Sequence, residues 1–173
     1  YLDLSAYGEK YYNSANVGNA DMVAALHWIQ DNIAGFGGDP GNVTLFGQSG
    51  GGVKVWSLLQ MPEADGLFHK GIIESGVVDP DLLGDIEDGN GREIVKAMLA
   101  ELGLEEKDVD QLESLPYDQL AQAYENAAPK VAQKGEYVGN HPHKNQSYFG
   151  DAIKHGFREE TKKIPLLIGT VLG

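Results

Sequence analysis

The fold of this chain is constrained most by a glycine-rich segment at residues 47–52. A short apolar run precedes this segment, and a longer run with apolar side chains at regular intervals follows it. Residues 43–46 are apolar and partly β-branched, and they follow turn-forming residues at 39–42, which is typical of a buried strand. After Gly50, apolar side chains recur at helical intervals as far as Leu59. The sequence therefore predicts a strand, a sharp turn and a helix in direct succession.

The predicted turn holds the pentapeptide Gly47-Gln48-Ser49-Gly50-Gly51, which fits the Gly-Xaa-Ser-Xaa-Gly pattern of serine hydrolases. In this pattern the serine adopts a strained conformation, and the flanking glycines let strand and helix approach closely. We expect the Ser49 hydroxyl to project from the bend near the positive end of the helix, where the Gly50 N–H would stabilise an oxyanion. The competing interpretation is a glycine-rich turn with an incidental serine.

Cofactor and metal sites have weaker support. A glycine-rich loop that opens a helix also binds phosphate, so nucleotide binding is a rival interpretation. However, no Gly-Lys-Ser/Thr follows the glycines, and no Gly-Xaa-Gly-Xaa-Xaa-Gly coincides with the end of the strand. His141 and His143 form a His-Xaa-His pair without a third ligand at a convincing spacing. We therefore expect neither a cofactor nor a metal.

Charge and composition exclude several classes of partner. Lys and Arg total 13 against 26 Asp and Glu, and the formal charge of −13 disfavours nucleic acid and anionic membranes. No apolar run approaches the roughly 18 residues of a membrane-spanning helix. The absence of cysteine excludes a disulfide framework and is compatible with a cytoplasmic or a secreted protein. Because the chain starts with neither a methionine nor a basic leader, we expect its 173 residues to begin inside a longer protein.

The other patterns predict an α/β fold with a mostly parallel sheet. One apolar stripe indicates an amphipathic helix: Met22, Leu26, Ile29 and Ile33. Asn19 or Asp21 would open this helix and Gly35 would close it. Residues 70–76 and 165–170 have the composition of further buried strands. Since a helix separates the strands at 43–46 and 70–76, a βαβ crossover with parallel pairing is expected.

Three regions of the chain differ in composition and in the spacing of their apolar residues, and we expect them to be distinct parts of the fold. Residues 1–80 hold the core with the strand, turn and helix, although residues 1–18 have the composition of a loop. Residues 81–160 form a helical side lobe, broken at Gly103 and Pro116, followed by an irregular loop from Pro129 and a charged helical segment at 154–163. Residues 161–173 return to the core as a strand.

Ser75 is a second candidate site residue. It stands at the carboxyl end of the strand predicted over residues 70–76, at the edge where open α/β sheets bind ligands. We therefore expect Ser75 to support the site around Ser49. The alternative is a serine that caps a turn.

Longer motifs accompany the pentapeptide: Asn16-Val17-Gly18, Ala25-Leu26-His27-Trp28-Ile29, Phe36-Gly37-Gly38-Asp39-Pro40, Asn42-Val43-Thr44, Leu67-Phe68-His69-Lys70 and Ser75-Gly76. With these motifs the chain closely resembles the type-B carboxylesterase family, the cholinesterase-like branch of the α/β-hydrolases. The resemblance runs from about residue 1 to 78 and returns at 164–173. It implies part of an α/β-hydrolase fold.

The resemblance also implies a serine esterase that hydrolyses small carboxylic esters through an acyl-enzyme. Ser49 would be the nucleophile and the Gly50 N–H one oxyanion donor. Apart from the resemblance, we expect Gln48, beside this serine, and Ser75, at the end of the next strand, to support the site. The family usually has Glu where this chain has Gln48, and Ala where it has Gly50. We expect these two departures to tune activity. A non-catalytic adhesion or scaffold domain on the same fold is the alternative function.

Other catalytic parts known from the family have no counterpart in this sequence. The oxyanion loop would precede Tyr1, the triad acid would be a Glu just after the strand near Gly169, and the histidine would follow later. The chain alone should therefore be nearly inactive. It should also have exposed strand edges, which the missing parts of the parent chain or self-association would cover.

A triad within the chain is a further possibility that the order of residues allows. Its acid would be Asp79 or Asp81, and its histidine would be His141, His143 or His155.

Overall fold

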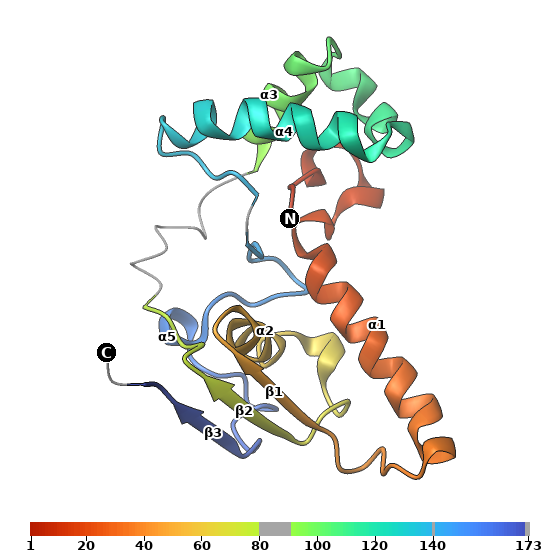
Figure 1. The fold of residues 1–173 in the computed structure, drawn as a ribbon, viewed down its shortest axis with the longest axis vertical. Coiled ribbons are helices and arrows are strands. Elements are labelled where there is room, and N and C mark those ends of the chain that lie inside the picture. Colours follow the sequence, from red (N-terminus) through yellow and green to blue (C-terminus); the bar gives the residue numbers. More distant parts are fainter. Residues whose placement is uncertain (80–90, 140, 172–173) are drawn as a thin grey trace. The chain divides into compact units, whose positions relative to one another are not determined.

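The chain forms two compact units (Figure 1). The computed structural model describes residues 1–79, 91–139 and 141–171. Residues 1–17 and 86–143 form one unit, which we call the helical unit, and residues 18–85 and 144–173 form the other, which we call the sheet unit. The three regions expected from the sequence, with boundaries at 80 and 160, stay a prediction.

Three parallel strands in the order β1-β2-β3 form the centre of the sheet unit. They are β1 (Thr44–Gln48), β2 (Lys70–Glu74) and β3 (Leu166–Gly169). The helix α2 (Gly50–Leu58) and the 3-10 helix η5 (Pro62–Ala64) lie between β1 and β2 in the chain. Because β1 and β2 pair in parallel, the predicted βαβ crossover is confirmed.

One face of the sheet is covered by helices. Apolar side chains of α1 (Val17–Asn32), α2 and β2 join in a single core, which includes Val23, Leu26, Val55, Trp56, Leu59 and Ile73. On the other face, the strand register aligns Phe46, Ile72 and Leu167 in one row. Phe46 is 78% exposed and Leu167 is 66% exposed. Parallel sheets are normally covered on both faces, so this apolar row lacks its usual cover among the described residues.

The helix α1 begins and ends at other residues than the sequence predicted. It starts at Val17, before Asn19 and Asp21, because the 3-10 turn η3 (Ser14–Asn16) leads directly into it. At its other end the chain tightens into η4 (Ile33–Phe36), and Gly37, with φ 83°, closes the turn. The expected closing residue, Gly35, lies inside η4.

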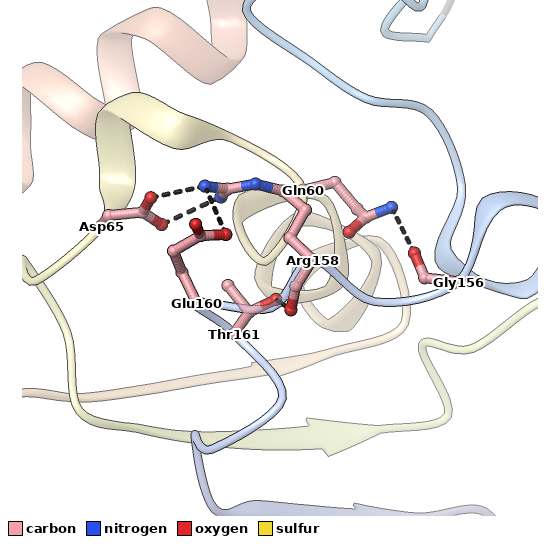
Figure 2. A network of polar contacts seen from close by, with 6 residues as sticks. All are labelled: Gln60, Asp65, Gly156, Arg158, Glu160 and Thr161. Atoms are coloured by element: carbon pink, nitrogen blue, oxygen red, sulfur yellow. Dashed lines mark hydrogen bonds and ion pairs between the residues drawn. The ribbon is translucent and has the colours of Figure 1, made fainter.

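Polar contacts hold the segment that leads into β3 against the loop after α2 (Figure 2). The Gln60 amide donates hydrogen bonds to the carbonyls of Gly150 at 3.0 Å and Gly156 at 3.1 Å. The Arg158 side chain is only 8% exposed and donates to both carboxylate oxygens of Asp65. These contacts hold most of residues 154–163 in turns, where the sequence predicted a helix. The observed helix α5 (Ala152–His155) is one turn long and ends at Gly156.

In the helical unit, α3 (Arg92–Glu101), the 3-10 helix η7 (Glu106–Ser114) and α4 (Tyr117–Ala132) share a second apolar core. Gly103 and Pro116 separate these helices, as predicted. Pro129 lies inside α4, so the expectation that the irregular loop begins there is wrong. The first residues, expected as a loop, form the 3-10 turns η1 (Ser5–Tyr7), η2 (Glu9–Tyr11) and η3.

A polar cluster attaches η2 to η7 within the helical unit. The buried Tyr11 hydroxyl donates to Asp110 Oδ1 at 2.9 Å and to Glu113. Lys10 Nζ lies 3.1 Å from Asp110 and 2.8 Å from Glu113. These partners lower the pKa of both carboxyl groups, with Tyr11 the main cause for Asp110 and Lys10 for Glu113. Burial is the main cause that raises the pKa of Tyr11 to about 12.

Backbone atoms of α2 approach the end of β1 directly. A Cβ built on Gly47 would lie 2.3 Å from the Gly51 carbonyl carbon and 2.4 Å from its oxygen. A Cβ on Gly51 would have no neighbour within 4 Å. The sequence-based expectation that the glycines two residues before and after Ser49 permit the close approach is therefore right for Gly47 and wrong for Gly51.

Tyr11→Phe should destabilise the chain by about 0.5–1.5 kcal/mol, because the Tyr11 hydrogen bonds from η2 to the exposed carboxylates of η7 are lost. Urea unfolding followed by circular dichroism would measure this change. Tyr117→Phe, which removes a hydroxyl from a side chain that is 81% exposed, is the matched control and should leave the free energy of unfolding unchanged. Equal stability of the two variants would contradict the role given to Tyr11.

Gly47→Ala and Gly51→Ala should change stability in opposite directions. The first forces the start of α2 away from β1 and should cost about 1–3 kcal/mol. The second places alanine in a helix without a clash and should add about 0.5 kcal/mol. Thermal unfolding of both variants measures the difference, and a loss of stability in Gly51→Ala similar to that in Gly47→Ala would contradict this description of the bend.

Candidate active site

Ser49 joins β1 to α2 in a backbone conformation that residues with a side chain rarely adopt, with φ 52° and ψ −121°. Its N–H donates to the Glu74 carbonyl at 2.8 Å, and its carbonyl accepts from the Val53 N–H at 3.0 Å. Such a conformation costs on the order of 1–3 kcal/mol and persists only where the surrounding structure enforces it. The strand, bend and helix predicted around Ser49 are thus present.

The Ser49 side chain is accessible for chemistry. Ser49 and Gly50 are both exposed, and the Ser49 hydroxyl makes no capping hydrogen bond to α2. The first N–H groups of a helix have no partner inside it, and Val53 is the residue whose N–H bonds back to Ser49. The Gly50 N–H therefore lies at the positive end of α2, one residue after Ser49 in the chain.

Gln48 and Ser75 lie with Ser49 at the end of the sheet that is formed by the carboxyl ends of the strands. Gln48 is the exposed last residue of β1 and is aligned with Glu74 of β2. Ser75 follows β2 with φ 50°, its N–H donates to the Gly169 carbonyl at 2.7 Å, and its hydroxyl lies 3.4 Å from that of Thr170. Among the described residues, Ser49 and Ser75 are the two with positive φ that are not glycine.

Two further glycines contribute to the bend and were missed in the sequence. Gly52 in α2 and Gly76 after β2 are buried and touch through their backbones: a Cβ on Gly76 would lie 2.4 Å from the Gly52 Cα. The available signal was the run of three glycines at 50–52, since the pentapeptide pattern accounts for only one of them.

The histidines considered for a triad lie in other surroundings. No hydrogen bond joins the Ser49 hydroxyl to a histidine of residues 1–79, 91–139 and 141–171. His155 lies 3.2 Å from Lys144 Nζ and lines a hollow of about 740 Å³, which Ser49 does not line. His141 and His143 belong to the helical unit, where burial lowers the pKa of His141 to about 4. Asp79 is exposed, and Asp81 lies outside the described residues.

The part of the chain that the structure describes contains no group of three or more acidic or histidine side chains placed to hold a metal. In that same part, no helix combines the length and the apolar character needed to cross a bilayer.

Comparison with known proteins gives consistent matches. The sequence profile of the carboxylesterase family matches residues 8–172. The para-nitrobenzyl esterase of Bacillus subtilis is 36% identical over 180 residues, which are 98% of this chain and 34% of the relative. Carboxylesterase 1D of Rattus norvegicus is 58% identical over 67 residues, which are 39% of this chain and 12% of the relative.

A solved structure is also similar over the whole chain. It is an esterase from the anaerobe Clostridium hathewayi that can hydrolyse aliphatic aromatic polyesters, with a TM-score of 0.94 at 52% identity over 100% of this chain and 34% of that one. The chain thus spans about a third of the length of the Bacillus and Clostridium esterases. A thermophilic pNB esterase is similar too, with a TM-score of 0.74 at 33% identity over 98% of this chain and 34% of that one. The parallel sheet with flanking helices, together with these two esterase structures, confirms the predicted part of an α/β-hydrolase fold. The chain belongs to the carboxylesterase family.

Proposed function

We propose that this chain supplies the nucleophile, Ser49, of a serine esterase that hydrolyses carboxylic esters through an acyl-enzyme. The observation that carries this proposal is the exposed serine held at φ 52° at the start of a helix. Strained conformations of this kind cluster at functional sites, because the strain positions a reacting group. The family and its esterase members support the same reaction.

In the proposed reaction, a general base removes the Ser49 hydroxyl proton while Oγ attacks the ester carbonyl carbon. The tetrahedral oxyanion accepts a hydrogen bond from the Gly50 N–H. When the carbon–oxygen bond breaks, the protonated base returns its proton to the departing alcohol. Water, deprotonated by the same base, then attacks the acyl carbon. The bond from that carbon to Ser49 Oγ breaks, the base returns the proton to Oγ, and the carboxylic acid is released. Gln48 and Ser75 support the site from the ends of β1 and β2.

We propose that the base and its acidic partner come from the part of the relatives' length that this chain does not span. The Ser49 hydroxyl has no hydrogen-bonded histidine among the described residues. Since loss of a triad member lowers kcat by about 10⁴- to 10⁶-fold, the 173 residues alone should be nearly inactive.

The alternative is a non-catalytic adhesion or scaffold domain on the same fold. Ser49 argues against it, because a scaffold gains nothing from a serine in a conformation that glycine adopts without strain. The two functions differ in whether the Ser49 hydroxyl reacts.

A fluorophosphonate probe should label the full-length protein at Ser49, and the protein should hydrolyse a p-nitrophenyl ester. Ser49→Ala should remove both activities, with kcat lower by about 10⁴-fold or more. Ser49→Gly should also remove them while raising the free energy of unfolding by about 1 kcal/mol, since it relieves the strain. A folded full-length protein that is neither labelled nor active would support the scaffold instead.

The same preparation tests the substrate class. Because the Clostridium esterase acts on aliphatic aromatic polyesters, we propose that such polyesters are substrates here too. Release of soluble acid from a polyester film, absent in Ser49→Ala, is the expected result. Hydrolysis of the p-nitrophenyl ester alone would restrict the proposal to small esters.

We propose that the chain also associates through its exposed sheet when no other polypeptide segment covers that sheet. Strands β1 and β3 are the edges of the sheet, and the row of Phe46, Ile72 and Leu167 is its bare apolar face.

In sedimentation velocity the 173-residue chain should form oligomers, and Phe46→Gln should shift it toward monomer. Phe36→Gln is the matched control, because Phe36 is 75% exposed but lies in η4, outside the sheet. A monomeric, cooperatively unfolding chain would refute the association.

A further inference from the structure

We propose that Gly76 is a positioning residue for the Ser49 bend, and that its backbone contact with Gly52 fixes the Gly50 N–H where the oxyanion forms. This inference rests on the proposed esterase function. Gly76 lies outside the pentapeptide and follows a different strand from Ser49.

The contact is closer than any side chain permits. A Cβ on Gly76 would lie 2.4 Å from the Gly52 Cα, 2.5 Å from the Gly52 carbonyl carbon and 2.8 Å from the Val53 nitrogen. A Cβ on Gly52 would lie 2.8 Å from the Gly76 Cα and 3.0 Å from the Gly47 oxygen. Neither glycine has a positive φ, so lack of space, and not backbone conformation, excludes a side chain at both positions.

Gly76 touches the helical turn that carries the Gly50 N–H. The Val53 N–H, which a Cβ on Gly76 would approach, closes that turn on the Ser49 carbonyl at 3.0 Å. On the strand side, the Ser49 N–H is held by the Glu74 carbonyl at 2.8 Å. The end of β2 therefore fixes the bend twice, through a hydrogen bond to Ser49 and through the packing of Gly76 on the first turn of α2.

The other end of α2 is also held, so the helix is not free to move away as a whole. Trp56 Nε1 donates to Asp151 Oδ2 at 3.1 Å. Figure 2 shows the second contact, in which the Gln60 amide after the helix donates to the Gly156 carbonyl at 3.1 Å. Trp56 and Gln60 are both buried. A methyl group on Gly76 is thus accommodated mainly at the start of α2, where it displaces the Gly50 N–H.

Such a displacement should act on the transition state and not on substrate binding. The negative charge that the Gly50 N–H stabilises develops on the carbonyl oxygen only as Oγ attacks. Loss of one oxyanion donor lowers kcat by about 10²- to 10³-fold. A shift that only weakens the hydrogen bond from the Gly50 N–H to the oxyanion should lower kcat by a smaller factor. KM should change little, because the enzyme keeps those contacts with the substrate that are equally strong in the ground state and in the transition state.

The test is steady-state hydrolysis of p-nitrophenyl butyrate by the full-length protein. Gly76→Ala should lower kcat by about 10- to 100-fold with KM within about twofold, and should slow fluorophosphonate labelling to a similar extent. Gly52→Ala, whose Cβ has the looser distance of 2.8 Å, should lower kcat less. Gly35→Ala is the matched control, since its Cβ has no neighbour within 4 Å, and should retain kcat.

The outcomes separate this inference from the proposed function. Wild-type turnover that Ser49→Ala removes supports the esterase, and unchanged kcat in Gly76→Ala then overturns only the role of Gly76. If kcat/KM of Gly76→Ala falls only because KM rises, the positioning role of Gly76 is overturned as well. If Gly76→Ala does not fold, the same measurement is made on the milder Gly52→Ala. A lower kcat with nearly unchanged KM supports the proposal, and an unchanged kcat overturns it. Without wild-type turnover, both proposals fail.

Discussion

The sheet unit depends on a contact between backbones, where the first turn of α2 lies directly on the ends of β1 and β2. Gly47, Gly52 and Gly76 supply this contact, since a Cβ on any of them would overlap main-chain atoms. Farther along the helix, buried side chains such as Val55 and Trp56 fill the space above the sheet. The start of α2 therefore comes closest to the strands where Ser49 leaves β1, and its unpaired N–H groups lie beside the serine.

The strain at this edge is balanced by the sheet itself. Ser49 and Ser75 have nearly the same positive φ, at 52° and 50°, and each follows the last residue of its strand. Their N–H groups donate to the Glu74 and Gly169 carbonyls, so the pairing of the strands continues one residue beyond β1 and β2. Two bends that would be unfavourable alone are thus enforced by the same hydrogen-bonding pattern that orders the sheet. The sheet brings two hydroxyl side chains to one edge.

Local patterns in the sequence predicted the parts of this site that depend on neighbouring residues. The strand, the bend at Ser49 and the parallel pairing follow from apolar runs and a short glycine motif. The contact between Gly52 and Gly76 was missed because it joins separate elements, and neither the glycine run at 50–52 nor the Ser75-Gly76 motif indicates which residue packs against which. Similarly, the charged residues at 154–163 suggested a helix, but pairing of Arg158 with Asp65 of another loop holds that segment in turns. Tertiary contacts decided both cases.

The charge of the chain is compatible with the proposed reaction. Gln48 is neutral and aligned with Glu74, so the edge beside Ser49 carries one carboxylate where a glutamate at 48 would make two on adjacent strands. Fewer negative charges beside the Gly50 N–H leave the positive end of α2 free to stabilise an oxyanion.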